Sequence, residues 1–332
     1  MSVPLDELSI IDRYFRPLAG NGAFGLLDDA GLIAIPSGEE LVVTTDMLAS
    51  DVHFLADDPP DTISRKALRV NLSDLAAKGA TPVAYVLSLA LTPDLDAAWL
   101  AGFAEGLAAD QRHYQVTLLG GDTIAVPERP IISITAFGHV SAGRMVHRVG
   151  GRPGDDLYVS GTIGGAAAGL ALLRREAGPW SVLTEGQRDA LVRRYRLPEP
   201  RTALAQALAE FATGAMDVSD GLVGDCDKLC AACGCSAVIE AEAVPLSGGL
   251  AGTTDPELVA RLLTAGDDFE ILATVAPENA PRFKAAAENA GVPLTRIGTL
   301  AGGEGPAKVL FEGAELGLSQ RAFVHRRVET AK

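Results

Sequence analysis

Six aspartates stand where apolar stretches of this chain give way to polar turns, and their carboxylates could act together. They are Asp29 in L-D-D-A, Asp46 in T-T-D-M, Asp74 in N-L-S-D-L, Asp122 in G-G-D-T, and Asp217 with Asp220 in M-D-V-S-D-G-L. If these acids meet in the fold, two carboxylates about 4 Å apart repel by roughly 4 kcal/mol even at an effective dielectric of 20. Hard divalent cations remove that repulsion, and Mg²⁺ prefers oxygen ligands. The set therefore predicts an acidic site, built from separate segments of the chain, that binds Mg²⁺ and a polyphosphate.

M-D-V-S-D-G-L is the strongest single motif. Asp217 and Ser219 alternate with apolar residues, so their side chains point the same way if this stretch is a strand. Asp220 follows at the turn, directly before a predicted helix whose backbone N–H groups favour anions. An ordinary helix cap made by Ser219 or Asp220 is a compatible structural reading.

The motifs of the first half are weaker when each is taken alone. The hydroxyls of Thr44 and Thr45 flank Asp46 at the end of a predicted strand, where a polar strand end is the plain alternative to a cation site. Asp74 lies inside a predicted helix beside its apolar face, although Asp has a poor helix propensity. A metal role for Asp74 and a simple ion pair with Lys78, one turn later, are both open.

Gly121, in G-G-D-T, would let a ligand approach the backbone closely, although the stretch also suits an ordinary strand-to-loop turn. The chain contains no G-K-S or G-K-T of a P-loop, so ATP would be held in another way. The spacing of the five histidines suggests no catalytic dyad or triad. His53, in D-V-H-F, is the one histidine near an acidic motif, and on residues alone we interpret it as structural.

Composition limits the class of protein. The net charge of −15 argues against a general nucleic-acid binder, which needs a basic surface, but not against a nucleotide bound through metal ions. No apolar run reaches the length of a membrane span, and the first residues lack the features of a signal peptide. We therefore expect no membrane association and a cytoplasmic location.

Four cysteines, Cys226, Cys230, Cys233 and Cys235, lie close together. Their spacing invites a zinc interpretation, but no histidine is nearby and three of them share one face of a predicted helix. We favour buried thiols.

Strands and helices alternate along the whole chain. The first half predicts strands over 41–45, 83–91, 116–119 and 131–140, and helices over 61–78 and 97–112. The second half predicts strands over 157–160, 215–218, 237–241 and 269–275, and a helix over 166–175. The composition break V-G-G-R-P-G-D-D, at 149–156, marks a domain boundary. The pattern predicts an α/β (α+β) architecture of two domains, 1–148 and 149–332.

Taken in order, these motifs resemble those of thiamine-monophosphate kinase, in the superfamily that includes aminoimidazole ribonucleotide synthetase and selenophosphate synthetase. The matching stretches lie at 28–30, 44–48, 52–54, 66–80, 120–123, 154–161 and 216–222. They extend through almost the whole chain, and K-A-L-R-V-N-L-S-D-L-A-A-K-G-A, at 66–80, is the most specific. Selenophosphate synthesis is disfavoured because the chain has no N-terminal cysteine.

The resemblance implies an enzyme that transfers the γ-phosphoryl group of ATP to thiamine monophosphate, giving thiamine diphosphate and ADP. It implies a homodimer in which the N-terminal domains pair their sheets, with ATP in a cleft near that interface. It also implies several Mg²⁺ ions, held by Asp29, Thr44, Thr45, Asp46, Asp74, Asp122, Asp217 and Asp220. Contacts to ATP would come from Gly121, Asp122, Arg148 and Ser219, and contacts to the acceptor from His53, Asp267 and Gln320. The nucleophile would be an already ionised phosphate oxygen, so no residue is assigned as a catalytic base.

Three positions differ from the family pattern. Leu27 replaces the usual glycine before D-D, Asp267 replaces a substrate-side Glu, and Gln320 replaces an aromatic residue expected to pack on the thiamine moiety. Asp267 and Gln320 would lie on the acceptor side. A related ATP-dependent enzyme with another phosphorylated acceptor is therefore the first alternative, and a non-catalytic nucleotide or metal sensor is an alternative of a different class.

Overall fold

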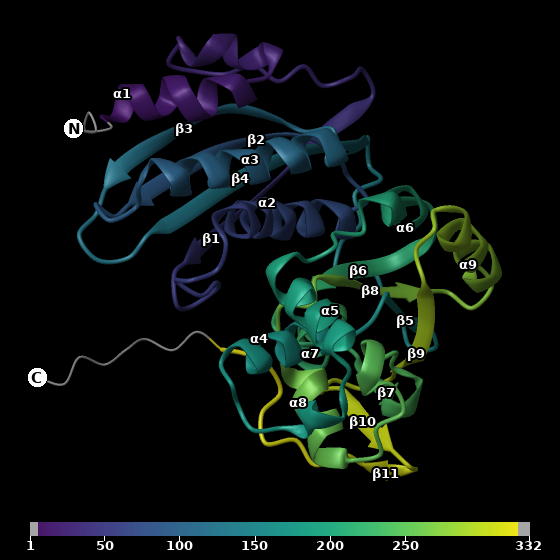
Figure 1. The fold of residues 1–332 in the computed structure, drawn as a ribbon. Coiled ribbons are helices and arrows are strands. Elements are labelled where there is room, and N and C mark those ends of the chain that lie inside the picture. Colours follow the sequence, from purple (N-terminus) through teal and green to yellow (C-terminus); the bar gives the residue numbers. More distant parts are fainter. Residues whose placement is uncertain (1–5, 325–332) are drawn as a thin grey trace, which may run out of the picture. The chain divides into compact units, whose positions relative to one another are not determined.

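The chain forms two compact units, Met1–Met145 and Val146–Lys332, which are described separately (Figure 1). This computed structural model describes residues 6–324. The division lies immediately before the composition break at 149–156. Both units contain a sheet and helices, so the predicted two-domain α/β architecture is confirmed.

Unit 1 contains a four-stranded sheet of order β1-β4-β2-β3. Its strands are β1 (Glu39–Ala49), β2 (Thr81–Leu91), β3 (Thr117–Ala125) and β4 (Ile131–Ser141). Strand β4 is antiparallel to both neighbours, whereas β2 and β3 are parallel. A parallel pair needs a crossover connection, which helix α3 (Ala97–Tyr114) supplies between β2 and β3.

Helix α2 (Pro60–Ala77) packs on β1, β4 and β2, and α3 packs beside α2 (Figure 1). Proline in the first turn of α2 suits a helix start, because that N–H has no partner inside the helix. Leu68, Leu72 and Leu75 recur at helical spacing and are fully buried. The N-terminal segment adds α1 (Glu7–Ile10), η1 (Ile11–Phe15), η2 (Arg16–Leu18) and η3 (Asn21–Leu26).

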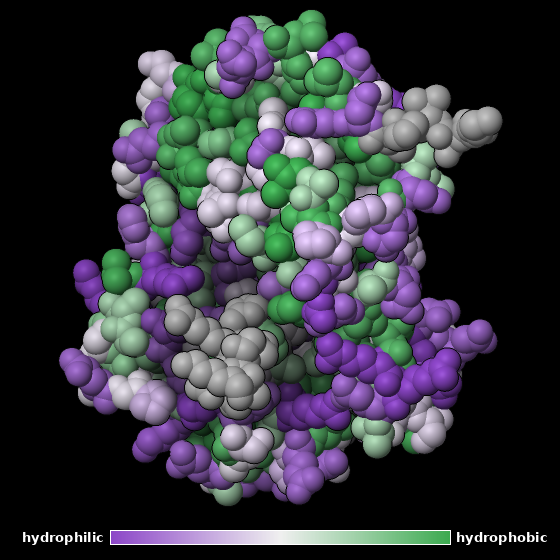
Figure 2. Space-filling view, turned by 90° about the vertical axis from the view of Figure 1, so that its left-hand side faces the viewer, coloured by the Kyte–Doolittle hydropathy of each residue, from purple (hydrophilic) through white to green (hydrophobic). Residues whose placement is uncertain are grey.

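The other face of β1 is apolar and open. Leu41, Val43 and Met47 alternate along the strand with residues that face α2, and they are 44%, 52% and 62% exposed. Figure 2 shows hydrophobic residues gathered over part of the surface of unit 1. Large exposed apolar patches commonly mark protein–protein or ligand-binding surfaces.

Two predicted turns lie inside strands. T-T-D was expected at a strand end, but β1 continues to Ala49. G-G-D-T was expected after a strand, but it lies within β3 and pairs with β2. The glycine at 121 explains the second case, because a Cβ there would lie 1.8 Å from the carbonyl oxygen of Leu87. Glycine thus allows two strand backbones to pass closely, instead of making a turn.

Unit 2 contains a seven-stranded sheet of order β11-β10-β7-β9-β5-β8-β6. The described pairs are antiparallel apart from the parallel pair of β7 and β10. Its strands are β5 (Asp156–Ser160), β6 (Ala212–Val218), β7 (Ser236–Glu240), β8 (Glu270–Val275), β9 (Leu294–Ala301), β10 (Lys308–Phe311) and β11 (Ala314–Glu315). Its α-helices are α4 (Gly165–Leu173), α5 (Glu185–Arg196), α6 (Ala205–Phe211), α7 (Leu222–Cys233), α8 (Pro256–Thr264) and α9 (Ala280–Asn289). Single helical turns are η4 (Pro179–Val182), η5 (Thr202–Leu204), η6 (Ala241–Ala243) and η7 (Gly248–Leu250).

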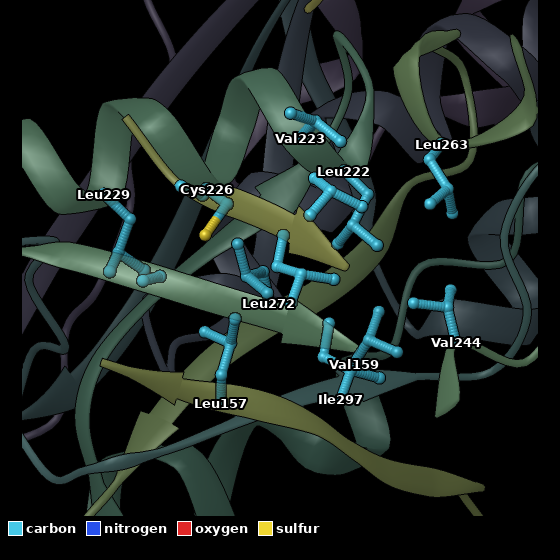
Figure 3. Packing of buried hydrophobic residues seen from close by; sticks show 14 of the residues in the cluster. Leu157, Val159, Leu222, Val223, Cys226, Leu229, Val244, Leu263, Leu272 and Ile297 are labelled. Atoms are coloured by element: carbon cyan, nitrogen blue, oxygen red, sulfur yellow. The ribbon is translucent and has the colours of Figure 1, made fainter. Parts of the chain in front are cut away.

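The core of unit 2 lies between α7 and the sheet. Leu222, Cys226 and Leu229 point from α7 toward Leu157 of β5 and Leu272 of β8 (Figure 3). All five side chains are fully buried. A helix start directly after β6 therefore has a large apolar anchor, which fixes the turn that carries Ser219 and Asp220.

The cysteines belong to this core. Cys226, Cys230 and Cys235 are buried in the apolar cluster, and Cys233 is partly buried against it. Burial raises the pKa of Cys235 to about 12, so its thiol stays protonated. The cysteines therefore pack as small apolar side chains, as the buried-thiol interpretation has it.

Within residues 6–324, no helix has both the length and the apolar character needed to cross a membrane.

Candidate active site

Asp29, Gly121 and Asp122 line one pocket of unit 1, with a volume of about 460 Å³. Asp29 comes from the loop after η3, and Asp122 comes from β3. Asp28 lines the same pocket, so three carboxylates and a bare stretch of backbone share it. The three acids are exposed, and the carboxylate of Asp122 accepts the backbone N–H of Thr123 at 2.9 Å. Such a pocket can hold an anion only if cations offset its charge.

Thr44 and Asp74 form a direct pair within unit 1. The hydroxyl of Thr44, on β1, donates to the Oδ2 of Asp74, on α2, at 2.5 Å. This partner differs from Lys78, which the sequence had suggested. A carboxylate can occupy this helix position because α2 lies against β1 and the strand supplies a donor.

Asp46 shares the α2-facing side of β1 with Thr44, since the two are two residues apart on a strand. Its backbone N–H donates to the Oδ1 of Asn71 at 3.0 Å. Thr45 faces the opposite side, where its hydroxyl donates to the carbonyl of Ile134 at 3.1 Å. The structure therefore groups Thr44, Asp46 and Asp74, and it places the Thr45 side chain apart from them.

His53 is held in a defined position by two contacts. Its Nδ1 accepts the backbone N–H of Ala49 at 3.1 Å, so the proton of the neutral ring lies on Nε2. Its backbone carbonyl accepts from the Nζ of Lys66 at 2.7 Å, and Lys66 is only 2% exposed. A buried ammonium thus fixes the loop that carries the predicted acceptor contact.

In unit 2, Asp217, Ser219 and Asp220 lie at the end of β6 and in the turn after it. Asp217 is 5% exposed, whereas the Asp220 side chain is 33% exposed. The expected cap of α7 by Ser219 or Asp220 is wrong, since the described N-cap residue is Gly221 without a side-chain cap. Asp225, inside α7, instead binds the turn before the helix, because its Oδ2 accepts the backbone N–H of Asp220 at 2.9 Å.

Lys228, one turn further along α7, contacts both of these acids. Its Nζ lies 2.5 Å from the Oδ2 of Asp220 and 2.7 Å from the Oδ1 of Asp225. Burial raises the pKa of Asp225. For Lys228, burial opposes the charged form, but hydrogen bonds to Asp220 and Asp225 outweigh it and raise the pKa. Sequence reasoning missed this group, although the D-x-x-K spacing of Asp225 and Lys228 on a helix predicts a pair.

Asp267 lies next to this turn in unit 2. Its backbone N–H donates to the carbonyl of Ser219 at 2.8 Å, and the N–H of Phe269 donates to Val218 at 2.8 Å. Asp267 has φ +74° and Phe269 has φ +49°, a left-handed conformation that side chains rarely adopt. Such strain persists only when surrounding contacts impose it, and it is common at functional sites.

Asp268, between those two residues, fixes the segment through contacts inside the protein. It is fully buried and accepts the backbone N–H of Gly164, before α4, at 2.8 Å. Burial raises its pKa to about 7, while the N–H donors oppose that rise.

The remaining two predicted residues, Gln320 and Arg148, also lie in unit 2. Gln320 is exposed, and its neighbour Arg321 binds Asp227 of α7 through two hydrogen bonds of 2.5 and 2.9 Å. The N–H of Phe323 donates to the carbonyl of Asp220 at 2.9 Å. This segment therefore runs beside the turn after β6 that carries Ser219 and Asp220, called the acidic turn below. Arg148 has an exposed side chain, and its carbonyl accepts from the Sγ of Cys233 at 3.0 Å.

The predicted metal ligands fit Mg²⁺ by donor type. All are carboxylate or hydroxyl oxygens, which Mg²⁺ prefers. Within residues 6–324, no three acids, histidines or cysteines are grouped closely enough to hold a metal ion by themselves.

Comparisons with known proteins place the chain in a family. Residues 27–140 match the N-terminal domain of AIR synthase related proteins, and residues 152–309 match the C-terminal domain. Fold and acidic motifs thus define a two-domain AIR synthase related protein.

Within that class, the thiamine-monophosphate kinase of Caulobacter vibrioides is 39% identical over 331 residues, covering 98% of this chain and 92% of that protein. A crystal structure of thiamine-monophosphate kinase from Stenotrophomonas maltophilia superposes with a TM-score of 0.81 at 36% identity, covering 93% and 98% of the two chains. A structure described as AaThiL complexed with AMPPCP and TMP gives a TM-score of 0.74 at 29% identity, covering 98% and 99%. The chain belongs to the thiamine-monophosphate kinase family.

Proposed function

We propose that this protein phosphorylates thiamine monophosphate to thiamine diphosphate with ATP as the phosphoryl donor. The observation that carries the proposal is the unit 1 pocket, where Asp29 and Asp122 converge beside the open backbone of Gly121. A polyphosphate fits such a pocket when divalent cations accompany it. The relative described with AMPPCP and TMP supports the same pair of substrates.

Phosphoryl transfer requires that the two substrates are aligned and that the negative charge of their phosphates is neutralised. The attacking atom is a phosphate oxygen of the acceptor, which is ionised at neutral pH, so no base has to remove a proton. The transferred phosphoryl group passes between two anionic oxygens, one from the acceptor and one from ADP. Bound Mg²⁺ would offset the charge on the phosphates. The residues proposed to hold it are Asp29, Thr44, Asp46, Asp74, Asp122, Asp217 and Asp220. Thr45, which the resemblance also implied, is left out because its side chain faces the opposite side of β1.

The protein's own residues bind and orient the two substrates. Gly121, Asp122, Arg148 and Ser219 are proposed to contact ATP. For the acceptor, His53 is a proposed contact, and its ring is oriented by the hydrogen bond that Nδ1 accepts from Ala49. Asp267 and Gln320 are the other proposed acceptor contacts.

We infer a homodimer formed through the open face of β1. Leu41, Val43 and Met47 are exposed there, and covering them with the same face of a second copy would remove apolar surface from water. Val43→Lys is expected to shift the molar mass measured by light scattering toward that of a single chain, whereas an unchanged mass would count against this interface. The cytoplasmic location stays a prediction from the sequence.

An assay of both products tests the proposed activity. Incubation with ATP, thiamine monophosphate and millimolar Mg²⁺ should give ADP and thiamine diphosphate in equal amounts. Folded protein that forms neither product would defeat the proposal. ADP formed only with another phosphorylated acceptor would instead support the related enzyme, which the departures at Asp267 and Gln320 make worth testing.

Asp46→Asn separates an enzyme from a sensor. Loss of turnover, with a changed dependence on Mg²⁺, is expected of an enzyme. A non-catalytic sensor would bind ATP without turnover in the wild type.

A further inference from the structure

An ammonium group stands at the acidic turn of unit 2, where Mg²⁺ is expected. Lys228 Nζ lies 2.5 Å from Asp220 Oδ2 and 2.7 Å from Asp225 Oδ1. The Asp225 side chain is fully buried, whereas Asp220 and Lys228 are 33% and 40% exposed. Lys228 is therefore anchored on a buried acid and reaches outward to an accessible one.

The three groups differ in how firmly they are fixed. Asp225 is held on both oxygens, by Lys228 and by the backbone N–H of Asp220. Removing the ammonium from Asp225 would leave a buried carboxylate with less compensation, which is costly. The contact between Lys228 and Asp220 is partly exposed and hence contributes little to stability. The outer contact is thus the one that can exchange.

We propose that Lys228 is a resident countercation that competes with a divalent cation for Asp220. This rests on the proposed function, in which Asp220 is a metal ligand. Without metal, the ammonium holds Asp220 in place and offsets its charge. When a divalent cation binds, repulsion between the two positive charges favours release of Asp220, while Lys228 stays on Asp225.

This competition makes the metal affinity of the acidic turn depend on bound nucleotide. Lys228 lowers the affinity of the acidic turn for a bare cation, since binding must displace or approach a positive charge. The negative phosphates of a nucleotide offset that penalty. The turn therefore binds metal weakly alone and more strongly with nucleotide present.

Metal binding without nucleotide tests the proposal directly. Titration calorimetry with Mg²⁺ on the full chain should show Lys228→Gln binding about twofold to fivefold more tightly than the wild type, a range set by the modest energy of a partly exposed pair. Lys228→Arg, which keeps the charge, should stay near the wild-type affinity. Lys308→Gln, an exposed lysine on β10 of the same unit, is the matched control.

Thermal unfolding supplies a second readout. In EDTA, Lys228→Gln should melt below the wild type because Asp220 and Asp225 lose a countercharge. Added Mg²⁺ should raise its melting temperature by more than that of the wild type. If Lys228→Gln folds poorly, Lys228→Met serves in the same two measurements.

Equal or weaker Mg²⁺ affinity in the glutamine variant would overturn the proposal, because a merely structural ion pair gives that result. Unchanged Mg²⁺ affinity in Asp220→Asn would also overturn the proposal, because Asp220 would then not be a metal ligand. Neither outcome bears on product formation by the wild type, which decides the kinase function separately.

Discussion

At the scale of single residues, the site depends on carboxylates that are placed by contacts to their neighbours. Asp74 is the clearest case, because a helix position that Asp disfavours is matched by the hydroxyl of Thr44 at 2.5 Å. Sequence could mark Asp74 as unusual but could not name its partner, since Thr44 is thirty residues away on another element. The same holds for Asp220, whose contact with Lys228 depends on how the turn enters α7.

Asp74→Asn should reduce kcat by about two orders of magnitude while leaving the fold intact. The amide oxygen can still accept from Thr44, but the charge that would bind Mg²⁺ is lost, and removal of one key electrostatic group typically costs this much. Steady-state rates over a range of Mg²⁺ concentrations provide the measurement. Asp94→Asn, an exposed acid in the loop before α3, is the control and should behave as the wild type. Equal loss in both variants would argue against a specific role.

Asp267→Asn should raise KM for thiamine monophosphate by about tenfold to a hundredfold, with kcat and the KM for ATP nearly unchanged. Asn tolerates the left-handed backbone at φ +74° as well as Asp does, so the change removes charge without adding strain. Losing one charged hydrogen-bond partner costs roughly 1.5–3 kcal/mol of binding. Initial rates with each substrate varied in turn test this. An unchanged acceptor KM would remove Asp267 from the acceptor site.

At the scale of elements, hydrophobic periodicity predicted the sheet strands and both long helices of unit 1. In unit 2 it gave no range for several elements, among them α5, α6, α8, α9, β9, β10 and β11. Helix α2 begins and ends within one residue of the predicted range, because buried leucines recur at helical spacing over 61–78. The two misplaced strand ends, at T-T-D and G-G-D-T, have one cause. Polar and glycine residues were interpreted as turns although strand pairing continues through them. The pairing partner that makes glycine necessary is not visible in a local sequence window.

Gly121→Ala should destabilise unit 1 and abolish activity. The added Cβ would lie 1.8 Å from the carbonyl oxygen of Leu87, so β2 and β3 must separate locally and distort the pocket that contains Asp122. Circular dichroism melting and turnover should both fall. The neighbouring Gly120 has nothing within 4 Å of its Cβ position, so Gly120→Ala is the matched control. Similar behaviour of the two variants would contradict the close-approach argument.

Glu270→Gln should lower the free energy of unfolding of unit 2 by about 3–5 kcal/mol. Its carboxylate is fully buried at the start of β8 and binds Arg194 at 2.5 Å and Arg201 at 2.6 Å. The amide leaves both guanidinium groups without their shared anion. Chemical denaturation followed by fluorescence measures the loss. Glu278→Gln, on the exposed loop after β8, should have little effect.

At the scale of the whole molecule, buried charge links stability to pH. Asp268 is the example, because burial raises its pKa to about 7 in the folded state against an ordinary value of 3.8. Between those values the folded chain holds more protons than the unfolded chain, so this group makes stability fall as pH rises from about 4 to about 7.

Asp268→Asn should therefore flatten the pH dependence of the melting temperature between pH 4.5 and 7.5. Each pH unit of unmatched protonation is worth about 1.4 kcal/mol, so the difference between the two curves should be measurable. Differential scanning calorimetry of both proteins, under matched ionic strength, gives the comparison. Parallel curves would mean that Asp268 titrates normally.

The sulfur chemistry of unit 2 offers a built-in probe of how often its interior opens. With Cys226, Cys230 and Cys235 buried and Cys233 partly accessible, an alkylating reagent should modify one site of the native chain early and the other three only during transient unfolding. Mass spectrometry of the modified peptides would then time the breathing motions of α7 against the sheet, without any introduced label.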